Sequence, residues 1–590
     1  MTEGNNLEKL RERIDKVDDS MMELLEERLK ISEEIASFKQ ENHLSVLDKD
    51  REREKLSAVR KSVDKKYSHY SEKLYKALAE LSKEHQRNCE NPDSETAKTG
   101  RYGLIGRNTS HSMSAKLHGL CADYDYELID VKDEEELAKL LSDDSYDGFN
   151  VTNPYKQTVM KYLDEVSELA RQVDAVNTIK RMPDGRLVGY NTDVYGFKFL
   201  VTRNMVGKKA IVLGTGGAAR AVVKALTDLG AKPVIYVSRN PVKSAKELPE
   251  GSIVIGYEDV ERHSDTRLLV NATPIGMYPD ISKSPLDAGH INLKRFKHLE
   301  LAIDLIYNPF RTRFIQDVER FAGKENLPIF NNILGSLRVG TVSGIDMLIR
   351  QGLLTRQIWL SEDVDQIEVS DEEALFLKRR LLEEQLNITL IGMPGSGKSS
   401  ISRQLAKELE RPYIDIDKKT EELLGRKIED CLLGTDEDVE QFRDMESKAL
   451  EENCSLSSNI IATGGGSVVR PQNRDYIKCN SIVVHLKRPL SQLSLKHRPL
   501  SQREGVDKLY RERIGIYKRL ADIHIGNENN FGETFNKEGG SNSYTYDIKK
   551  FSYRIKKKVG AFIDEIVDYQ WTQYELAWHK RTRALRKKDI

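Results

Sequence analysis

Residues 1–90 carry a helical pattern of apolar positions. Apolar side chains recur at intervals of three or four, interrupted at position 28, and occupy positions 7, 10, 14, 17, 21, 24, 31, 35 and 38. This spacing places them on one stripe of a long helix. No glycine or proline stands between Gly4 and Pro92, so we expect an all-α domain over residues 1–90 and a polar linker over residues 91–100.

Arg28 occupies the apolar stripe at the interrupted position. A guanidinium there carries a large free-energy cost unless it meets an anion. Lys39 follows about three turns later on nearly the same face, and Arg11 lies roughly a quarter turn away. The stripe alone would fit a dimerising coiled coil, whereas its cations favour a bound dianion.

Beyond residue 100, short β-branched runs alternate with helical segments, which is typical of α/β domains. The clearest predicted strands are residues 102–106, 210–214, 233–238, 268–273 and 301–307. A charged helix at 371–386 leads into a strand at 387–391. The predicted fold class is therefore an all-α domain followed by two α/β domains. The predicted boundaries are 101–365 (lobes 101–200 plus 330–365, and 201–329), a linker helix 366–385, a domain 386–570 with a disordered Gly/Asn-rich insert 527–543, and a basic tail 571–590.

Composition argues against several classes of binding partner for the chain. Lys and Arg total 93 against 94 for Asp and Glu, so no net charge draws the protein to nucleic acid or to a membrane. The five cysteines form no CxxC pair, which argues against a disulfide framework or a thiolate zinc site. No apolar run approaches the length of a membrane span or a signal core. We expect a cytoplasmic protein acting on small molecules.

Residues 392–399 read GMPGSGKS, a complete phosphate-binding loop. In such a loop Lys398 reaches the outer phosphates and Ser399 can ligate Mg²⁺. This predicts ATP or GTP chemistry and leaves the phosphoryl acceptor open. The backbone N–H groups expected around the phosphates belong to Gly392, Gly395, Ser396 and Gly397.

A predicted strand at 412–417 follows the loop, and Asp415 and Asp417 alternate along it. A nucleotide-dependent switch or regulatory binder is one interpretation of this block. The absence of a guanine-recognition motif and the small size of the block favour a kinase.

A second nucleotide signature lies upstream, where a glycine turn joins a predicted strand to a helix. Gly214, Gly216 and Ala219 fit the GxGxxA dinucleotide fingerprint in that context. After the next strand, Arg239 and Lys243 stand where an NAD enzyme places an acidic residue. Both cations suit a 2′-phosphate, so NADP is favoured. The turn also contains Gly217 and Ala218, which we assign to the same cofactor.

The amino-terminal block resembles the all-helical chorismate mutases in the runs LRERI, EERL, SFK, DKDRERE and ELSKEHQ. The resemblance implies conversion of chorismate to prephenate without a cofactor, with Lys39 and Gln86 on the oxygen that gains charge. It also implies a homodimer in which Arg11 reaches the partner's site. The implied site residues are Arg11, Arg28, Lys39, Asp48, Arg51, Glu52, Ser82 and Gln86.

The central block resembles the shikimate dehydrogenases in HSMS, NVTNPYK, AVNT, NTD, NATPIGM and the run 344–351. The resemblance implies NADPH-dependent reduction of 3-dehydroshikimate to shikimate, with Lys156 and Asp193 as the acid/base pair. Ala115 and Asp346 replace a proline and a glycine usual in that family; neither departure removes a catalytic group. The implied substrate-binding residues are Ser112, Ser114, Thr152, Asn177 and Gln351, with Gly344 beside the cofactor.

The carboxy-terminal block resembles the shikimate kinases in its loop, its triple glycine and the order of its arginines. The resemblance implies ATP-dependent phosphorylation of shikimate, with Asp415 beside Ser399 on Mg²⁺ and Asp417 as base. Glu446 would position Arg443. The implied acceptor and lid residues are Arg443, Gly464, Gly465, Gly466 and Arg513 around shikimate, and Arg498 over the phosphoryl group.

The predicted kinase lid departs from that family. The segments 489–498 and 498–513 are each about four residues shorter than expected, which would weaken closure over the phosphates. An arginine usual near Ser494 and Leu495 is absent. Two hypotheses therefore stand: a trifunctional enzyme, or a mutase and dehydrogenase joined to a nucleotide-binding pseudo-kinase.

Overall fold

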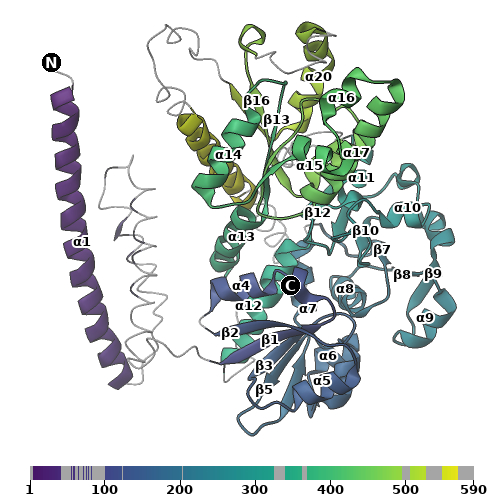
Figure 1. The fold of residues 1–590 in the computed structure, drawn as a ribbon. Coiled ribbons are helices and arrows are strands. Elements are labelled where there is room, and N and C mark those ends of the chain that lie inside the picture. Colours follow the sequence, from purple (N-terminus) through teal and green to yellow (C-terminus); the bar gives the residue numbers. More distant parts are fainter. Residues whose placement is uncertain are drawn as a thin grey trace. The chain divides into compact units, whose positions relative to one another are not determined.

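The computed structural model forms two compact units, residues 1–99 and 100–590, which are described separately (Figure 1). Among the described residues, no helix combines the length and apolar character needed to cross a membrane. The described residues are 4–41, positions 55, 58, 59, 64, 71, 75, 78 and 82, and residues 100–122, 124–201, 203–323, 339–361, 369–493, 505–526 and 548–568.

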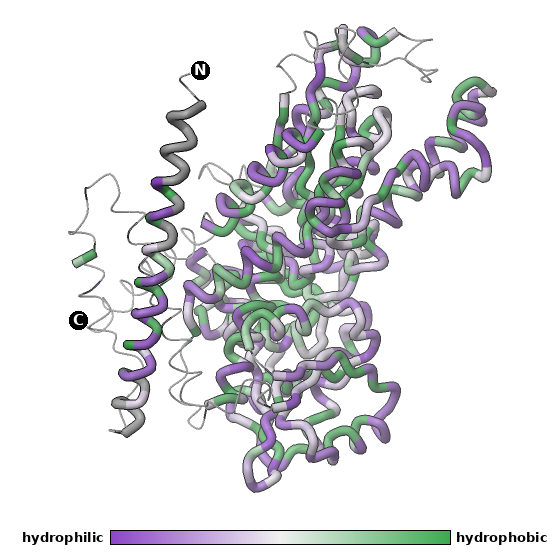
Figure 2. The backbone as a smooth tube through the Cα atoms, turned by 60° about the vertical axis from the view of Figure 1, so that its left-hand side comes forward, coloured by the Kyte–Doolittle hydropathy of each residue, from purple (hydrophilic) through white to green (hydrophobic). Residues whose placement is uncertain are grey.

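Helix α1 (Gly4–Glu41) confirms the long helix predicted at the amino terminus. Hydrophobic and hydrophilic positions alternate over the coloured part of this helix (Figure 2). The described members of its apolar stripe are exposed in the single chain, with Ile14 at 60%, Leu24 at 63% and Ile31 at 48%. An apolar stripe of this extent is suited to pairing with another helix.

The first lobe of the second unit has a mixed sheet with strand order β2-β1-β3-β5-β6-β4. Strand β1 pairs in parallel with β2 and β3, whereas β5 runs antiparallel to β3 and β6. Helices α4 and α12 cover one face and α5 and α6 the other (Figure 1). The bounds are β1 (Arg101–Gly106), α4 (Ser114–Cys121), β2 (Asp125–Asp130), α5 (Glu134–Leu141), β3 (Gly148–Val151), β4 (Glu165–Val166), α6 (Glu168–Val173), β5 (Thr178–Arg181), β6 (Leu187–Tyr190), α7 (Asp193–Leu200) and α12 (Ile345–Leu360).

The second lobe has a parallel sheet with strand order β12-β11-β10-β7-β8-β9. This is the doubly wound order, and its direction reverses between β7 and β10, where such sheets bind dinucleotides. The bounds are β7 (Ala210–Leu213), α8 (Gly217–Asp228), β8 (Val234–Ser238), α9 (Pro241–Glu247), β9 (Ile253–Gly256), β10 (Leu268–Asn271), α10 (Pro285–Ala288), β11 (Leu301–Asp304), α11 (Arg313–Phe321) and β12 (Gly340–Val342).

Two predicted strands of this lobe end earlier than their apolar pattern indicated. The strands expected at 268–273 and 301–307 stop at Asn271 and Asp304. The Asn271 amide donates to the Asp304 carboxylate at 3.0 Å, so buried polar side chains mark the end of the ladder. The residues that follow are therefore free to form loops at the carboxyl edge.

The third sheet is parallel, with strand order β14-β15-β13-β16-β17. Helical residues 548–568 contribute to the same apolar core as β13 and β16. The bounds are β13 (Asn387–Ile391), α14 (Lys398–Leu409), β14 (Tyr413–Asp415), α15 (Ile416–Leu424), α16 (Ile428–Leu433), α17 (Asp436–Cys454), β15 (Ile460–Ala462), α18 (Pro471–Cys479), β16 (Ser481–Lys487), α20 (Val506–Leu520) and β17 (Ile523–Gly526).

The strand predicted at 412–417 is wrong at its carboxyl end. The ladder with β15 stops at Asp415, which pairs with Ala462. Helix α15 begins at Ile416, so Asp417 lies in its first turn rather than on the strand. An acidic side chain is favoured there because it faces the positive end of the helix dipole.

Helix α13 (Asp371–Gln385) occupies most of the segment predicted as a linker helix. Its Leu377 and Leu381 are fully buried in an apolar core that also contains Ile349 of α12 and Ile388 of β13. The helix thus packs the two α/β domains together. A second contact joins α11 to α18, where Asp475 accepts hydrogen bonds from both Arg313 and Arg320.

Candidate functional sites

In the amino-terminal unit, Arg28 pairs with Ser82, two of the predicted mutase residues. The Arg28 Nε donates to the Ser82 hydroxyl at 3.0 Å, and that hydroxyl donates to the Leu78 carbonyl at 2.9 Å. The guanidinium also lies 5.8 Å from the ring centroid of Tyr75. Arg28 is therefore held by polar and aromatic groups although it belongs to the apolar stripe.

The remaining predicted mutase residues fall largely beyond the described side chains. Arg11 and Lys39 belong to α1, but their side-chain positions are outside the described set. The same holds for the whole residues Asp48, Arg51, Glu52 and Gln86.

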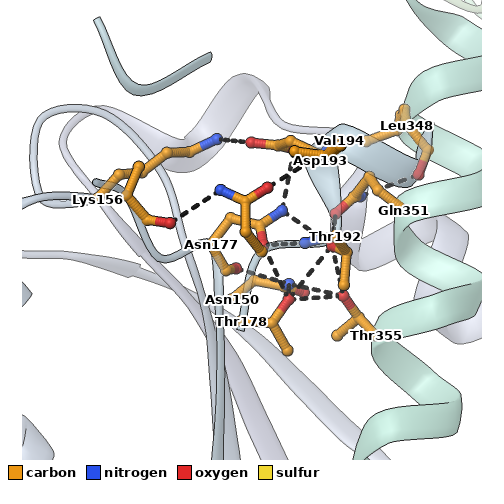
Figure 3. Close-up of polar contacts among 12 residues, drawn as sticks. Asn150, Lys156, Asn177, Thr178, Thr192, Asp193, Val194, Leu348, Gln351 and Thr355 are labelled. Atoms are coloured by element: carbon orange, nitrogen blue, oxygen red, sulfur yellow. Dashed lines mark hydrogen bonds and ion pairs between the residues drawn. The ribbon is translucent and has the colours of Figure 1, made fainter. Parts of the chain in front are cut away.

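In the central α/β domain, the structure brings Lys156 and Asp193 together. Lys156 comes from the loop after β3, and Asp193 begins α7. The ammonium donates to Asp193 Oδ2 at 2.5 Å, while the Asn177 amide donates to Oδ1 at 2.9 Å (Figure 3). Both carboxylate oxygens are thereby engaged, and the lysine is held with only 16% of its side chain exposed.

Thr192 connects Asn177 to Gln351 behind this pair (Figure 3). The Asn177 side chain accepts from the Thr192 N–H at 2.8 Å and donates to its hydroxyl at 2.9 Å. The Thr192 hydroxyl also lies 3.3 Å from Gln351 Oε1, and Gln351 donates to the Leu348 carbonyl at 2.9 Å. This network fixes the orientation of two predicted substrate-binding amides.

The predicted hydroxyl residues line the same lobe. The Ser112 hydroxyl donates to that of Ser114 at 3.0 Å. Thr152 packs against β1, since a Cβ on Gly106 would lie 2.5 Å from its methyl group.

Tyr307 is a site residue that sequence reasoning missed. It follows β11 and interacts with the Ser112 side chain, which belongs to the other lobe. Burial raises the pKa of the Tyr307 phenol, and the Ser112 side chain opposes that rise. The sequence pattern predicted a strand through residue 307, so Tyr307 was not considered as a site residue. Its position three residues after the end of a parallel strand, where such sheets bind ligands, was the signal that could have identified it.

The glycine turn lies at the switch point of the doubly wound sheet. Gly214 follows β7 with φ +111°, a conformation that favours glycine. A Cβ on Gly217 would lie 3.2 Å from Lys156 Cβ, so this residue brings the turn close to the catalytic candidate. Gly216 is the residue before α8, and Ala218 lies in its first turn.

The predicted 2′-phosphate residues Arg239 and Lys243 are exposed beyond β8, and Lys243 lies 3.6 Å from Glu247.

Gly344 has a packing requirement of its own, because a Cβ there would lie 2.0 Å from the Leu305 carbonyl oxygen. It sets the start of α12 against the loop after β11.

The phosphate-binding loop connects β13 to α14. Lys398 is buried, and its ammonium donates to the Gly392 and Met393 carbonyls at 2.9 and 3.1 Å. Ser399 lies in the first turn of α14. Behind the loop, burial lowers the pKa of His485 to about 3, so this imidazole is neutral. Gly395, Ser396 and Gly397 complete the loop.

The triple glycine brings the predicted acceptor residues together by close backbone approach. A Cβ on Gly464 would lie 2.4 Å from Asp417 Oδ1, and one on Gly466 would lie 2.8 Å from Arg443 Nη1. The Gly465 carbonyl accepts from Arg513 at 3.1 Å. The carboxylates and guanidiniums of this set therefore surround one glycine loop.

Glu446 holds Arg443, as predicted from the sequence. The Arg443 Nη1 donates to Glu446 Oε2 at 2.7 Å, and Ser467 donates to Oε1 at 2.8 Å. Glu446 is nearly fully buried. A buried carboxylate that lacked these partners would carry a large cost in free energy. The lid residue Arg498 lies outside the described residues.

Asp415 and Ser399 offer oxygen ligands beside the phosphate loop. No group of three or more His, Cys, Asp or Glu side chains with metal-binding geometry occurs in the described part of the chain. Mg²⁺ fits this donor set, because it is usually bound by one or two protein oxygens together with phosphates and waters.

These sites define a two-lobed dinucleotide-dependent dehydrogenase joined to a P-loop phosphotransferase. Models of three families match the chain: Chorismate mutase type II at residues 10–87, Shikimate dehydrogenase substrate binding domain at 104–179 and Shikimate kinase at 394–537. The chain belongs to the shikimate dehydrogenase family and carries chorismate mutase and shikimate kinase domains on either side. The predicted families and fold class are confirmed.

Individual relatives cover the central domain. A Shikimate dehydrogenase (NADP(+)) of Clostridium perfringens is 35% identical over 286 residues, which are 47% of this chain and 96% of the relative. That of Clostridium beijerinckii is 37% identical over 275 residues, 45% of this chain and 93% of the relative. A solved chorismate mutase/shikimate 5-dehydrogenase fusion protein from Clostridium acetobutylicum is 33% identical, covers 49% of this chain and 98% of its own, and has a TM-score of 0.41.

Proposed function

We propose that this chain catalyses three reactions of aromatic amino-acid biosynthesis. It converts chorismate to prephenate, reduces 3-dehydroshikimate to shikimate with NADPH, and phosphorylates shikimate to shikimate 3-phosphate with ATP. The observation that carries the proposal is the Lys156–Asp193 pair, because its two partners come from separate segments and are held in one orientation by Asn177. The reductase product is the kinase substrate, so two of the reactions are consecutive.

In the reductase, Lys156 protonates or stabilises the carbonyl oxygen as negative charge develops on it. The Asp193 carboxylate keeps the lysine ammonium charged and holds its orientation. The Asn177 amide in turn holds the orientation of the Asp193 carboxylate. NADPH, when bound, supplies the hydride. Arg239 and Lys243 would hold its 2′-phosphate, and the turn at 214–218 its pyrophosphate. The substrate contacts are assigned to Ser112, Ser114, Thr152, Asn177 and Gln351.

In the kinase, Lys398 and the loop amides hold the ATP phosphates, while Ser399 and Asp415 hold Mg²⁺. Asp417 accepts the proton of the acceptor hydroxyl. Arg443 and Arg513 bind the acceptor's carboxylate, since guanidiniums pair well with carboxylates. The contact of Asp417 with Gly464 supports a shared site for base and acceptor.

In the mutase, Arg28 binds a substrate carboxylate, and Ser82 supports it through the 3.0 Å hydrogen bond. The exposed stripe of α1 supports a homodimer formed through this helix. The described cysteines are free thiols, which suits a reducing compartment, and we place the enzyme in the cytoplasm.

Steady-state assays of the full chain, one substrate at a time, test the three activities separately. We expect prephenate from chorismate, NADPH oxidation with 3-dehydroshikimate, and shikimate 3-phosphate from ATP and shikimate. Absence of only the last product would establish the pseudo-kinase hypothesis. Sedimentation of the full chain would test the dimer, which a monomer at all concentrations would contradict.

A further inference from the structure

Tyr413 lies beside the side chains assigned to the kinase cation. It begins β14, and its hydroxyl donates to Asp415 Oδ2 at 2.7 Å. Burial and Asp415 raise the pKa of this phenol, and the side chain of Ser399 on α14 opposes that rise. The hydroxyl of Tyr413 therefore holds one of the two assigned ligands directly.

The position of Tyr413 follows from strand geometry. Residues two apart on a strand point to the same side, so Tyr413 and Asp415 share one face of β14. The Arg403 guanidinium carbon lies 5.6 Å from the Tyr413 ring centroid and holds the ring from α14. The phenol is thus fixed at both its ring and its hydroxyl.

A neutral phenol is well suited to orient a metal-ligating carboxylate. It donates one hydrogen bond to Oδ2 and leaves the carboxylate charge in place, whereas an arginine or lysine would neutralise it. Because Oδ2 is restrained, the carboxylate already has little rotational freedom before a cation binds. Oδ1 can therefore face the cation at a small cost in entropy. Partners of metal ligands commonly act in this way.

We propose that Tyr413 is a positioning residue for the divalent cation of the kinase, acting through Asp415. This inference rests on the proposed kinase function. The competing interpretation is that Tyr413 only packs against the apolar core beside β14, to which its ring also contributes. The two interpretations differ in what removal of the hydroxyl alone should change.

The test is Tyr413→Phe in the full chain, which removes the hydroxyl and keeps the ring. ATP binding is measured by calorimetry over a Mg²⁺ titration and in excess EDTA. We expect the half-saturating Mg²⁺ concentration to rise about tenfold, the effect typical of losing a partner of a metal ligand. ATP affinity in EDTA should stay unchanged. Tyr476→Phe, a partly buried tyrosine of α18, is the matched control.

Dependence on Asp415 is tested by a double variant. Asp415→Asn should itself weaken the Mg²⁺ effect, and adding Tyr413→Phe should then change nothing further, because the two residues act as one unit. Dehydrogenase activity of the same chain checks folding.

An unchanged Mg²⁺ dependence in Tyr413→Phe, or an equal loss of ATP affinity in EDTA, would overturn the positioning role and leave the kinase assignment standing. A wild-type chain whose ATP binding ignores Mg²⁺ would overturn both.

Discussion

The Lys378 ammonium lies 2.7 Å from both carboxylate oxygens of Asp346. The lysine side chain is only 1% exposed and belongs to α13, whereas Asp346 lies in the first turn of α12. Burial lowers the pKa of Lys378, and the carboxylate of Asp346 opposes that shift. Asp346 therefore supplies the anion that the buried lysine of the helix leading to the kinase requires.

The Lys378–Asp346 pair predicts that a variant lacking only the carboxylate is much less stable than a variant lacking both charges. Asp346→Asn leaves a buried ammonium without its anion and should destabilise the chain by about 3–5 kcal/mol. Adding Lys378→Met should recover most of that loss, because an apolar chain of similar length needs no partner. Urea unfolding measures both effects. Asp280→Asn removes an exposed pair with Lys283 and should cost under about 1 kcal/mol; a similar cost for Asp346→Asn would refute the buried-charge explanation.

Asp304 predicts a pH dependence of stability. The fully buried carboxyl accepts hydrogen bonds from Thr312, Ile306 and Asn271, yet burial raises its pKa to about 7. The folded chain therefore binds a proton that the unfolded chain has released above its pKa of about 3.9. The contribution of this group to stability is full below the lower pKa and is lost as pH rises towards 7.

Asp304→Asn imitates the protonated acid, so the difference in Tm between variant and wild type should increase from pH 5 to pH 8. Thermal unfolding at several pH values measures it, with Asp280→Asn as the exposed control. A difference that does not vary with pH would show that Asp304 stays ionised in the folded chain.

Local rules predicted much of the fold. The GxGxxA turn at Gly214 and the loop at Gly392 were found because their backbone conformations restrict which residues can occupy them. The end of a short strand was harder to predict. Asp417 lies on a helix because β15 offers β14 only three partners, and that limit is set by a segment more than forty residues away.

The sites were predicted less evenly than the elements. Lys156 and Asp193 are 37 residues apart in the chain, a separation that no periodicity bridges, and only the family resemblance paired them. Tyr307 and Lys378 were missed because their partners, Ser112 and Asp346, meet them through tertiary packing alone. Contacts between domains leave little trace in local patterns.

Lys156 should be essential to one activity only. Lys156→Ala removes the ammonium beside Asp193 and should lower the rate of NADPH oxidation by 3-dehydroshikimate about 10²–10⁴-fold, the range for a lost acid/base group. Prephenate formation should not change, because the mutase belongs to the other unit. Lys161→Ala, which breaks an exposed pair with Glu134, is the matched control. Retained reductase activity in Lys156→Ala would remove Lys156 from the mechanism.

Gly465 should be irreplaceable in the kinase for a steric reason. A Cβ there would lie 2.5 Å from Pro394 Cγ and 2.9 Å from its backbone nitrogen. Because the proline ring is rigid and part of the phosphate loop, Gly465→Ala must displace either the loop or the glycine turn. A shift of about 1 Å can cost 10²-fold in rate, so kcat/KM for shikimate should fall by about that factor.

The reductase rate of the same Gly465→Ala chain should stay at the wild-type value, since the displaced segments belong to the kinase. Gly515→Ala is the matched control within α20. Its Cβ would meet Arg519 at an ordinary 3.5 Å, and alanine stabilises a helix interior by about 1 kcal/mol relative to glycine. The control should therefore keep kinase activity and gain stability. Equal kinase activity in both variants would mean that the phosphate loop and the glycine turn do not pack as closely in the working enzyme.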